Sequence, residues 1–98
     1  MVVLKGALTV VASPDEAATV IPIATSALAT AGTGDLLAGM IAGLMAQGMD
    51  AYDAAISASW LHGVAGLNAE RIQGQGASVL ARDIIDQIPN ALKKTTAQ

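Results

Sequence analysis

Apolar residues form short β-branched runs near the start of the chain and longer runs at helical spacing after them. The short runs cover residues 2–4, 8–12 and 18–22, and they are separated by Lys5-Gly6-Ala7 and Ser13-Pro14-Asp15. β-branched runs bounded by Gly and Pro predict strands, here two or three of them. Because these runs are nearly continuous rather than alternating, we expect strands covered on both faces, as in α/β sheets.

The first longer run, residues 36–46, has no polar side chain and predicts a helix that Gly48 ends. A membrane span needs about 20 apolar residues, so this run is too short to cross a bilayer. We therefore expect a buried helix. Gly39 and Gly43 lie one turn apart, and their small size predicts that a strand or helix packs closely against them.

A second helix is predicted from Asp50, placed as its N-cap, to about Ile72. Gly63 and Gly66 are unfavourable inside a helix, so we expect close packing there as compensation. His62, on an apolar stretch of this helix, is interpreted as a packed, hydrogen-bonded side chain rather than a catalytic one.

A third, short helix is expected after the loop at residues 73–76, ending at Pro89. Residues 93–98 are expected to fray. The side chains expected to face inward from this helix are Leu80, Ile84, Ile85 and Ile88.

Composition favours one domain over residues 1–98, because 98 residues with 53% hydrophobic side chains suffice for a single core. Trp60 and Tyr52 are the only aromatic residues. Packing must therefore rely on small and aliphatic side chains, with Trp60 expected as a packing anchor.

Charge and cysteine content exclude several classes of function. A formal net charge of −3 with only five Lys and Arg residues argues against nucleic acid as a partner. The absence of cysteine excludes disulfides, thiolate metal sites and a cysteine nucleophile, and it fits a cytoplasmic protein. No secretory leader pattern opens the sequence. Any phosphate-bearing partner is expected to be small.

Three predicted strands are fewer than a doubly wound sheet usually carries. A strand at residues 2–4 would also expose a sheet edge unless something pairs with it. We therefore expect either a homo-oligomer or the C-terminal end of a longer protein, completed by a separately encoded N-terminal half if the rest is not on this chain.

The residues before the first predicted helix, Gly32-Thr33-Gly34-Asp35, are typical of an anion site. The first amide groups of a helix lack internal partners and carry partial positive charge, and glycine lets a phosphate approach the backbone. A tight turn stabilised by Asp35 would explain the same four residues. The nearby segment Lys5-Gly6-Ala7-Leu8-Thr9 at a strand end favours the phosphate interpretation.

The segment from Ala29 to Gly48 resembles the signature of the ATP- or ADP-dependent NAD(P)H-hydrate dehydratases, which belong to the ribokinase-like superfamily. Supporting matches lie at residues 3–6, 53–55, 61–66 and 83–89. The similarity covers nearly the whole chain but only the C-terminal part of the family. It implies an α/β fold, a ribokinase-like fragment of two or three N-terminal strands followed by three helices.

The resemblance implies an enzyme that repairs hydrated NADH or NADPH. ATP or ADP, with Mg²⁺, would phosphorylate the hydrate, and loss of phosphate would restore the nicotinamide. Asp35 matches the acid that contacts the hydrate, and Gly34 matches a glycine that contacts the nucleotide, with the Gly32 and Thr33 amides beside it. The segment that cradles the nucleotide is matched by Lys5, Gly6, Ala7, Leu8 and Thr9.

Other interpretations remain open on the residues alone. Lys5 also suits an edge strand, where lysine discourages aggregation, and Thr9 suits an ordinary strand position. Residues 21–27 and Arg82 depart from the family pattern. The alternatives are another ribokinase-like small-molecule kinase, or a non-catalytic interaction module that oligomerises.

Overall fold

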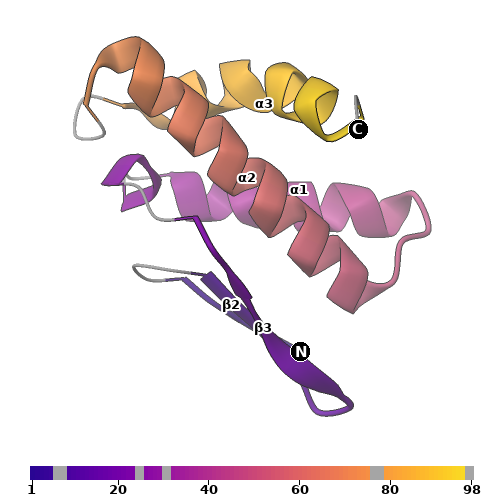
Figure 1. Ribbon diagram of the computed structural model, residues 1–98. Coiled ribbons are helices and arrows are strands. Elements are labelled where there is room, and N and C mark those ends of the chain that lie inside the picture. The colour runs from indigo at the N-terminus through magenta and orange to yellow at the C-terminus, as the bar shows by residue number, and fades with distance from the viewer. Residues whose placement is uncertain (6–8, 24–25, 30–31, 76–78, 97–98) are drawn as a thin grey trace.

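The computed structural model describes residues 1–5, 9–23, 26–29, 32–75 and 79–96 (Figure 1). Three strands come first, and a 3₁₀ turn and three α-helices follow. In chain order these are β1 (Val2–Leu4), β2 (Thr9–Ser13), β3 (Glu16–Ile21), η1 (Ser26–Ala29), α1 (Thr33–Ala46), α2 (Ala51–Gln73) and α3 (Ala81–Thr96). The predicted α/β order of strands and helices is confirmed.

The strands form one antiparallel sheet in the order β1-β2-β3. In its register Val3 pairs with Val11, and Val11 pairs with Thr19. Helix α2 contacts β2 and β3 from one face of this sheet, and Figure 1 shows it running above the strands. Among the described residues nothing covers the opposite face, where Leu4 is 62% and Val20 50% exposed. The expectation of strands covered on both faces is therefore wrong for this chain, in which the described helices cover one face of an antiparallel sheet.

Helix α2 is the centre of the molecule, because two apolar clusters form on its sides. One lies toward the sheet and consists of Val11, Tyr52 and Ala55, with Val3, Ile41 and Ile56 packed against it. The other lies toward α3 and η1 and consists of Ala27, Leu61, Ala65, Ala69, Val79, Ile84 and Ala91. Small side chains on α2 let both neighbours approach closely.

Local signals define both ends of α2, and the predicted N-cap, Asp50, is confirmed. The Asp50 carboxylate accepts a hydrogen bond from the Asp53 amide at 3.3 Å, which caps the start. Gly74 ends the helix with φ of +86°, and its amide bonds to the Glu70 carbonyl at 2.8 Å. Inside the helix, a Cβ on Gly63 would lie 2.8 Å from Ile23 Cδ1. The predicted close packing at Gly63 is confirmed.

Several packing expectations are wrong. Pro89 lies inside α3, which continues to Thr96, so residues 93–96 are helical; residues 97 and 98 lie outside the described residues. Proline is tolerated at this point on an exposed side of the helix, where the lost hydrogen bond faces solvent. Trp60 is 42% exposed rather than an anchor, and Gly39 and Gly43 have no neighbour within 4 Å of an added Cβ.

On α3, two of the four side chains expected inside are exposed. Ile84 is fully buried and Ile88 packs on the core, but Leu80 and Ile85 are 50% and 49% exposed. A single helix side contacts α2, and these two residues lie beside it. None of the described helices combines the length and apolar character that crossing a bilayer requires.

Candidate functional site

The start of α1 presents backbone amide groups without a side-chain cap. Gly32 is the N-cap residue with φ of +91°, and its carbonyl accepts the Leu36 amide at 3.1 Å. A non-glycine residue would be strained in this left-handed conformation. Gly34 is exposed with no neighbour within 4 Å of an added Cβ, so the backbone is open to a ligand there. The helix dipole adds partial positive charge at this end.

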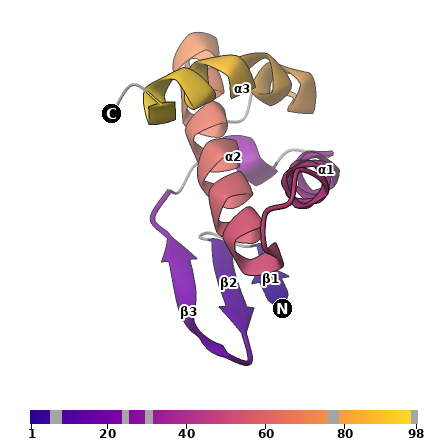
Figure 2. The same ribbon diagram turned by 90° about the vertical axis from the view of Figure 1, so that its right-hand side faces the viewer.

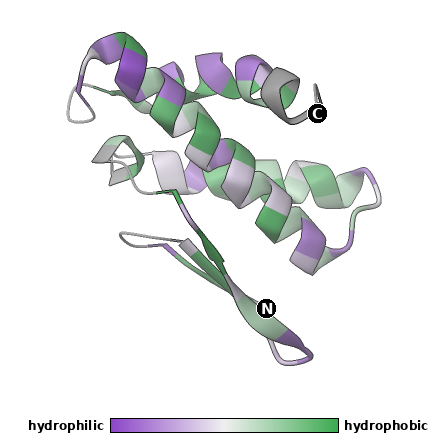
Figure 3. Ribbon diagram, viewed as in Figure 1, coloured by the Kyte–Doolittle hydropathy of each residue, from purple (hydrophilic) through white to green (hydrophobic). Residues whose placement is uncertain are grey.

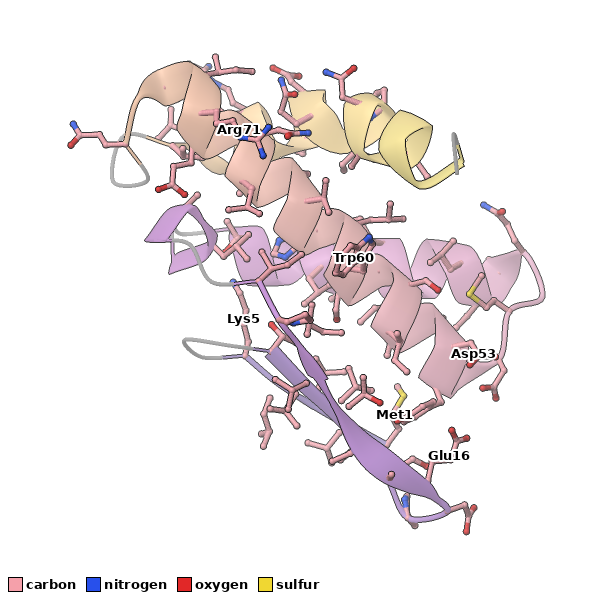
Figure 4. The ribbon with its side chains drawn as sticks, in the orientation of Figure 1. Met1, Lys5, Glu16, Asp53, Trp60 and Arg71 are labelled. Carbon is pink, nitrogen blue, oxygen red and sulfur yellow. The ribbon has the colours of Figure 1, made fainter. Side chains whose placement is uncertain are left out.

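Lys5, the residue after β1, reaches the start of α1. Its Nζ donates a hydrogen bond to Thr33 Oγ1 at 2.5 Å, and Thr33 Oγ1 in turn donates to the Leu28 carbonyl at 2.8 Å. Figure 4 shows the Lys5 side chain rising from the strand toward the helical layer. Thr33 is 1% exposed. One buried hydroxyl therefore links the sheet, η1 and the first turn of α1.

Burial lowers the pKa of Lys5 from its ordinary value of 10.5, with no carboxylate among the described residues opposing that effect. An ammonium group beside a helix N-terminus concentrates positive charge, and such a place favours a bound anion. Asp35 occupies the third position of α1, at the exposed rim of the same turn.

His62 lies beneath this site on α2 and is 1% exposed. Burial and, second to it, the positive charge of Lys5 lower the pKa of His62 to about 4, while a hydrogen bond with the Thr33 backbone acts in the opposite direction. The ring is thus neutral at physiological pH. Its Nε2 is buried without a hydrogen-bond partner among the described residues. The interpretation of His62 as a packed side chain is confirmed, but its place beside Lys5 and Thr33 had no signal in the sequence.

The structure brings Lys5 together with Thr33, and Gly32, Gly34 and Asp35 lie on the same turn as Thr33. Thr9 is buried at the start of β2, where it pairs with Ile21 at the same end of the sheet. The predicted nucleotide residues Gly6, Ala7 and Leu8 lie outside the described residues.

A separate cavity of about 170 Å³ opens between the end of α2 and α3. It is lined by none of the predicted site residues. Its lining consists of Ala69, Ile72, Gln73, Asp83, Asp86 and Gln87.

Strand order, helix order and the glycine-rich helix start together define a ribokinase-like α/β fold. The structure superposes on that of YxkO from Bacillus subtilis, a member of the UPF0031 family, with a TM-score of 0.80 and 37% sequence identity. The match covers 94% of this chain and 34% of that protein.

The model of the NAD(P)H-hydrate dehydratase family matches residues 1–90, and the chain belongs to that family. The bifunctional NAD(P)H-hydrate repair enzyme of Moorella thermoacetica is 44% identical over 93 residues, which are 95% of this chain and 17% of that enzyme. The ADP-dependent (S)-NAD(P)H-hydrate dehydratase of Neisseria meningitidis is 46% identical over 83 residues, which are 85% of this chain and 28% of that enzyme. The chain thus spans about a third or less of the length of these relatives.

Proposed function

We propose that residues 1–98 form a single segment of an ADP- or ATP-dependent NAD(P)H-hydrate dehydratase domain, and that this segment supplies its phosphate-binding and proton-accepting groups. The observation that carries the proposal is the hydrogen bond from Lys5 Nζ to Thr33 Oγ1 at the uncapped start of α1. It holds an ammonium group beside open backbone amides, with the carboxylate of Asp35 at the rim. Family membership adds the nucleotide and the hydrate as the expected ligands.

The arrangement suits phosphoryl transfer, which depends on positioning and charge stabilisation. Asp35 accepts the proton of the hydrate's hydroxyl group. The oxygen of that hydroxyl bonds to the terminal phosphorus of the nucleotide, and the bond between this phosphorus and the rest of the nucleotide breaks. The backbone amides from Gly32 to Asp35 and the Lys5 ammonium stabilise charge on the transferring group. Loss of phosphate, with a proton from the neighbouring carbon, then restores NADH or NADPH.

The family's nucleotide would bring Mg²⁺ on its phosphates. The described residues contain no group of three or more His, Asp or Glu side chains arranged to hold a metal ion. We therefore assign no metal ligand to this chain. A cytoplasmic location fits substrates of this kind.

The experiment is a binding titration of ADP, and separately of ATP, against the wild type and two variants, by calorimetry. Lys5→Met removes the ammonium group, and we expect it to weaken nucleotide binding about tenfold or more, because charge-assisted hydrogen bonds are the stronger ones. Arg71→Met is the matched control, since Arg71 is exposed near the far end of α2 (Figure 4). Equal affinity of both variants would contradict the proposed phosphate site.

Asp35→Asn tests the proton acceptor separately. We expect nucleotide affinity to stay within about twofold of wild type, while turnover of hydrated NADH, wherever the complete domain is assembled, falls by about 100-fold or more. The isolated chain, spanning a third or less of its relatives, is expected to turn over slowly or not at all. Phosphorylated hydrate that accumulates without elimination would favour a simple kinase instead.

A further inference from the structure

The turn from Gly32 to Asp35 has little apolar packing of its own to hold it in place. It carries no apolar side chain, and Figure 3 shows this start of α1 pale to purple, against the green of the helix that follows. Gly32, Gly34 and Asp35 are exposed, whereas Thr33 is buried, with 1% of its surface exposed. No side chain caps the helix. The position of the open amide groups therefore depends on what holds Thr33.

Thr33 is held by polar contacts from three other parts of the fold. Its hydroxyl accepts a hydrogen bond from Lys5 Nζ at 2.5 Å and donates one to the Leu28 carbonyl at 2.8 Å. Its backbone makes a hydrogen bond with the ring of His62 on α2. Helix α1 packs against α2, and Figure 2 shows α1 nearly end-on beside it. Of these contacts, the one from His62 acts directly on the peptide backbone of the turn.

The hydrogen bond between His62 and Thr33 has a defined direction. It acts to raise the pKa of the ring, and a hydrogen bond does so when the ring donates it, so the acceptor is the Thr33 carbonyl oxygen. His62 Nε2 has no partner among the described residues, which leaves Nδ1 as the donor. A neutral ring carries a single N–H group. The arrangement therefore requires the tautomer that has its proton on Nδ1.

Packing alone does not account for a histidine at this place in α2. The ring is 1% exposed, and a buried Nε2 without a partner among the described residues costs stability that an aliphatic side chain would not. A leucine could fill similar space but has no N–H group to donate to the Thr33 carbonyl. Because burial keeps the His62 ring neutral, the ring donates this bond without repelling the Lys5 ammonium group.

We propose that His62 is a positioning residue of the phosphate site: its Nδ1–H holds the Thr33 carbonyl against α2, which fixes the open amides of the turn and the hydroxyl that binds Lys5. The effect on nucleotide binding rests on the proposed function, whereas the contact that holds the turn is a property of the fold. His62 is buried too deeply to touch a ligand itself. It acts through Thr33.

Two substitutions separate the hydrogen bond from the volume of the ring. His62→Leu fills the space without a donor, whereas His62→Asn can place its amide nitrogen where the ring has Nδ1 and so restore the bond. Ser59→Ala is the matched control, because Ser59 lies one turn earlier on α2, is 3% exposed, and has an Oγ without a partner among the described residues. Circular dichroism of all three variants checks that the fold is kept.

The first measurement is hydrogen exchange at the Leu36 amide, which bonds to the Gly32 carbonyl at 3.1 Å and closes the first turn of α1. Relative to the Gly74 amide at the far end of α2, we expect this exchange to be about tenfold faster in His62→Leu and within about twofold of wild type in His62→Asn and Ser59→Ala. The second is calorimetric titration with ADP, whose affinity should fall about fivefold or more in His62→Leu and be largely restored in His62→Asn.

NMR of the ring nitrogens tests the contact directly, because His62 is the only histidine. We expect the proton on Nδ1 at neutral pH. A proton on Nε2 would overturn the proposal, and so would equal Leu36 exchange in His62→Leu and Ser59→Ala.

The ADP titration distinguishes failure of this proposal from failure of the phosphate site. An affinity that is unchanged in His62→Leu but lower in Lys5→Met would overturn the positioning role. An affinity unchanged in both variants would contradict the phosphate site instead. Leu36 exchange and the tautomer of His62 involve no nucleotide, so they still decide whether His62 holds the turn.

Discussion

Lys5 Nζ donates a 2.5 Å hydrogen bond to Oγ1 of Thr33, a residue 28 positions away in the sequence. The bond joins the end of β1 to the first turn of α1, and Thr33 passes the connection on to the Leu28 carbonyl. It places a positive charge where the backbone of α1 is open. The stability of the site and its proposed chemistry therefore depend on the same hydroxyl group.

Thr33→Val should destabilise the fold, because valine keeps the shape but removes the hydroxyl that serves both Lys5 and Leu28. Leaving buried polar groups without a partner costs about 1–3 kcal/mol of unfolding free energy. Urea denaturation measures this loss. Thr33→Ser retains the hydroxyl and should lose less. A valine variant as stable as the wild type would show that water replaces the Thr33 hydroxyl.

Stability should fall as the pH drops from about 6.5 toward 4, because the pKa of His62 is about 4 in the folded protein against 6.5 in the unfolded chain. Above pH 6.5 both states hold a neutral ring and the stability is complete. Between pH 6.5 and pH 4 the His62 ring binds a proton in the unfolded chain but stays neutral in the folded protein. The loss amounts to on the order of 3 kcal/mol when complete.

His62→Gln should flatten this pH dependence between pH 7 and 5, measured by denaturation at each pH. His62 is the only histidine, so its ring signals can be followed by NMR without assignment. Lys5→Met removes the neighbouring positive charge, and the pKa of His62 should rise toward 6.5 as a result. An unchanged pKa would place Lys5 too far away to act.

Gly63→Ala should destabilise the protein by about 1–3 kcal/mol despite the higher helix propensity of alanine. The added Cβ would meet Ile23 Cδ1 at 2.8 Å and Ile23 Cβ at 3.1 Å. Combining it with Ile23→Ala should relieve part of the clash, which a double-mutant cycle detects as coupling. Gly39→Ala is the matched control, since it meets nothing within 4 Å and should stabilise by about 0.5–1 kcal/mol.

Pro89→Ala should stabilise the chain, since proline inside a helix removes one hydrogen bond and crowds the preceding turn at a cost of about 3 kcal/mol. Pro89 is exposed, so little packing is lost. Thermal unfolding should show a midpoint several degrees higher. A lower midpoint would mean that the chain needs a bend at this residue.

Local sequence signals predicted most of the elements. Asp50 caps the start of α2 with its side chain, and Gly74 ends the helix through its backbone freedom. Both effects are local, so neither depends on residues far away in the sequence. Pro89 misled the prediction of α3, because an exposed helix side tolerates the missing hydrogen bond. The expected burial of Trp60 was also wrong, since a large ring is buried only if a neighbour covers that side of α2.

The candidate site divides in the same way. Glycines followed by an acid at a helix start are a local pattern, and the sequence by itself therefore predicted the turn from Gly32 to Asp35 and its suitability for an anion. The roles of these residues stay a prediction. Their neighbours are not local, because His62 comes from α2 and Lys5 from β1, and only the folded chain places them beside Thr33.

The sequence by itself therefore determined the order of strands and helices, the start of α2, the glycine-rich turn before α1 and the family, since each depends on residues close together along the chain. Only the tertiary structure decided which sheet face is covered and that Lys5 bonds to Thr33 over a neutral His62. Those properties arise from contacts between residues far apart in sequence, and side-chain periodicity carries no information about such partners.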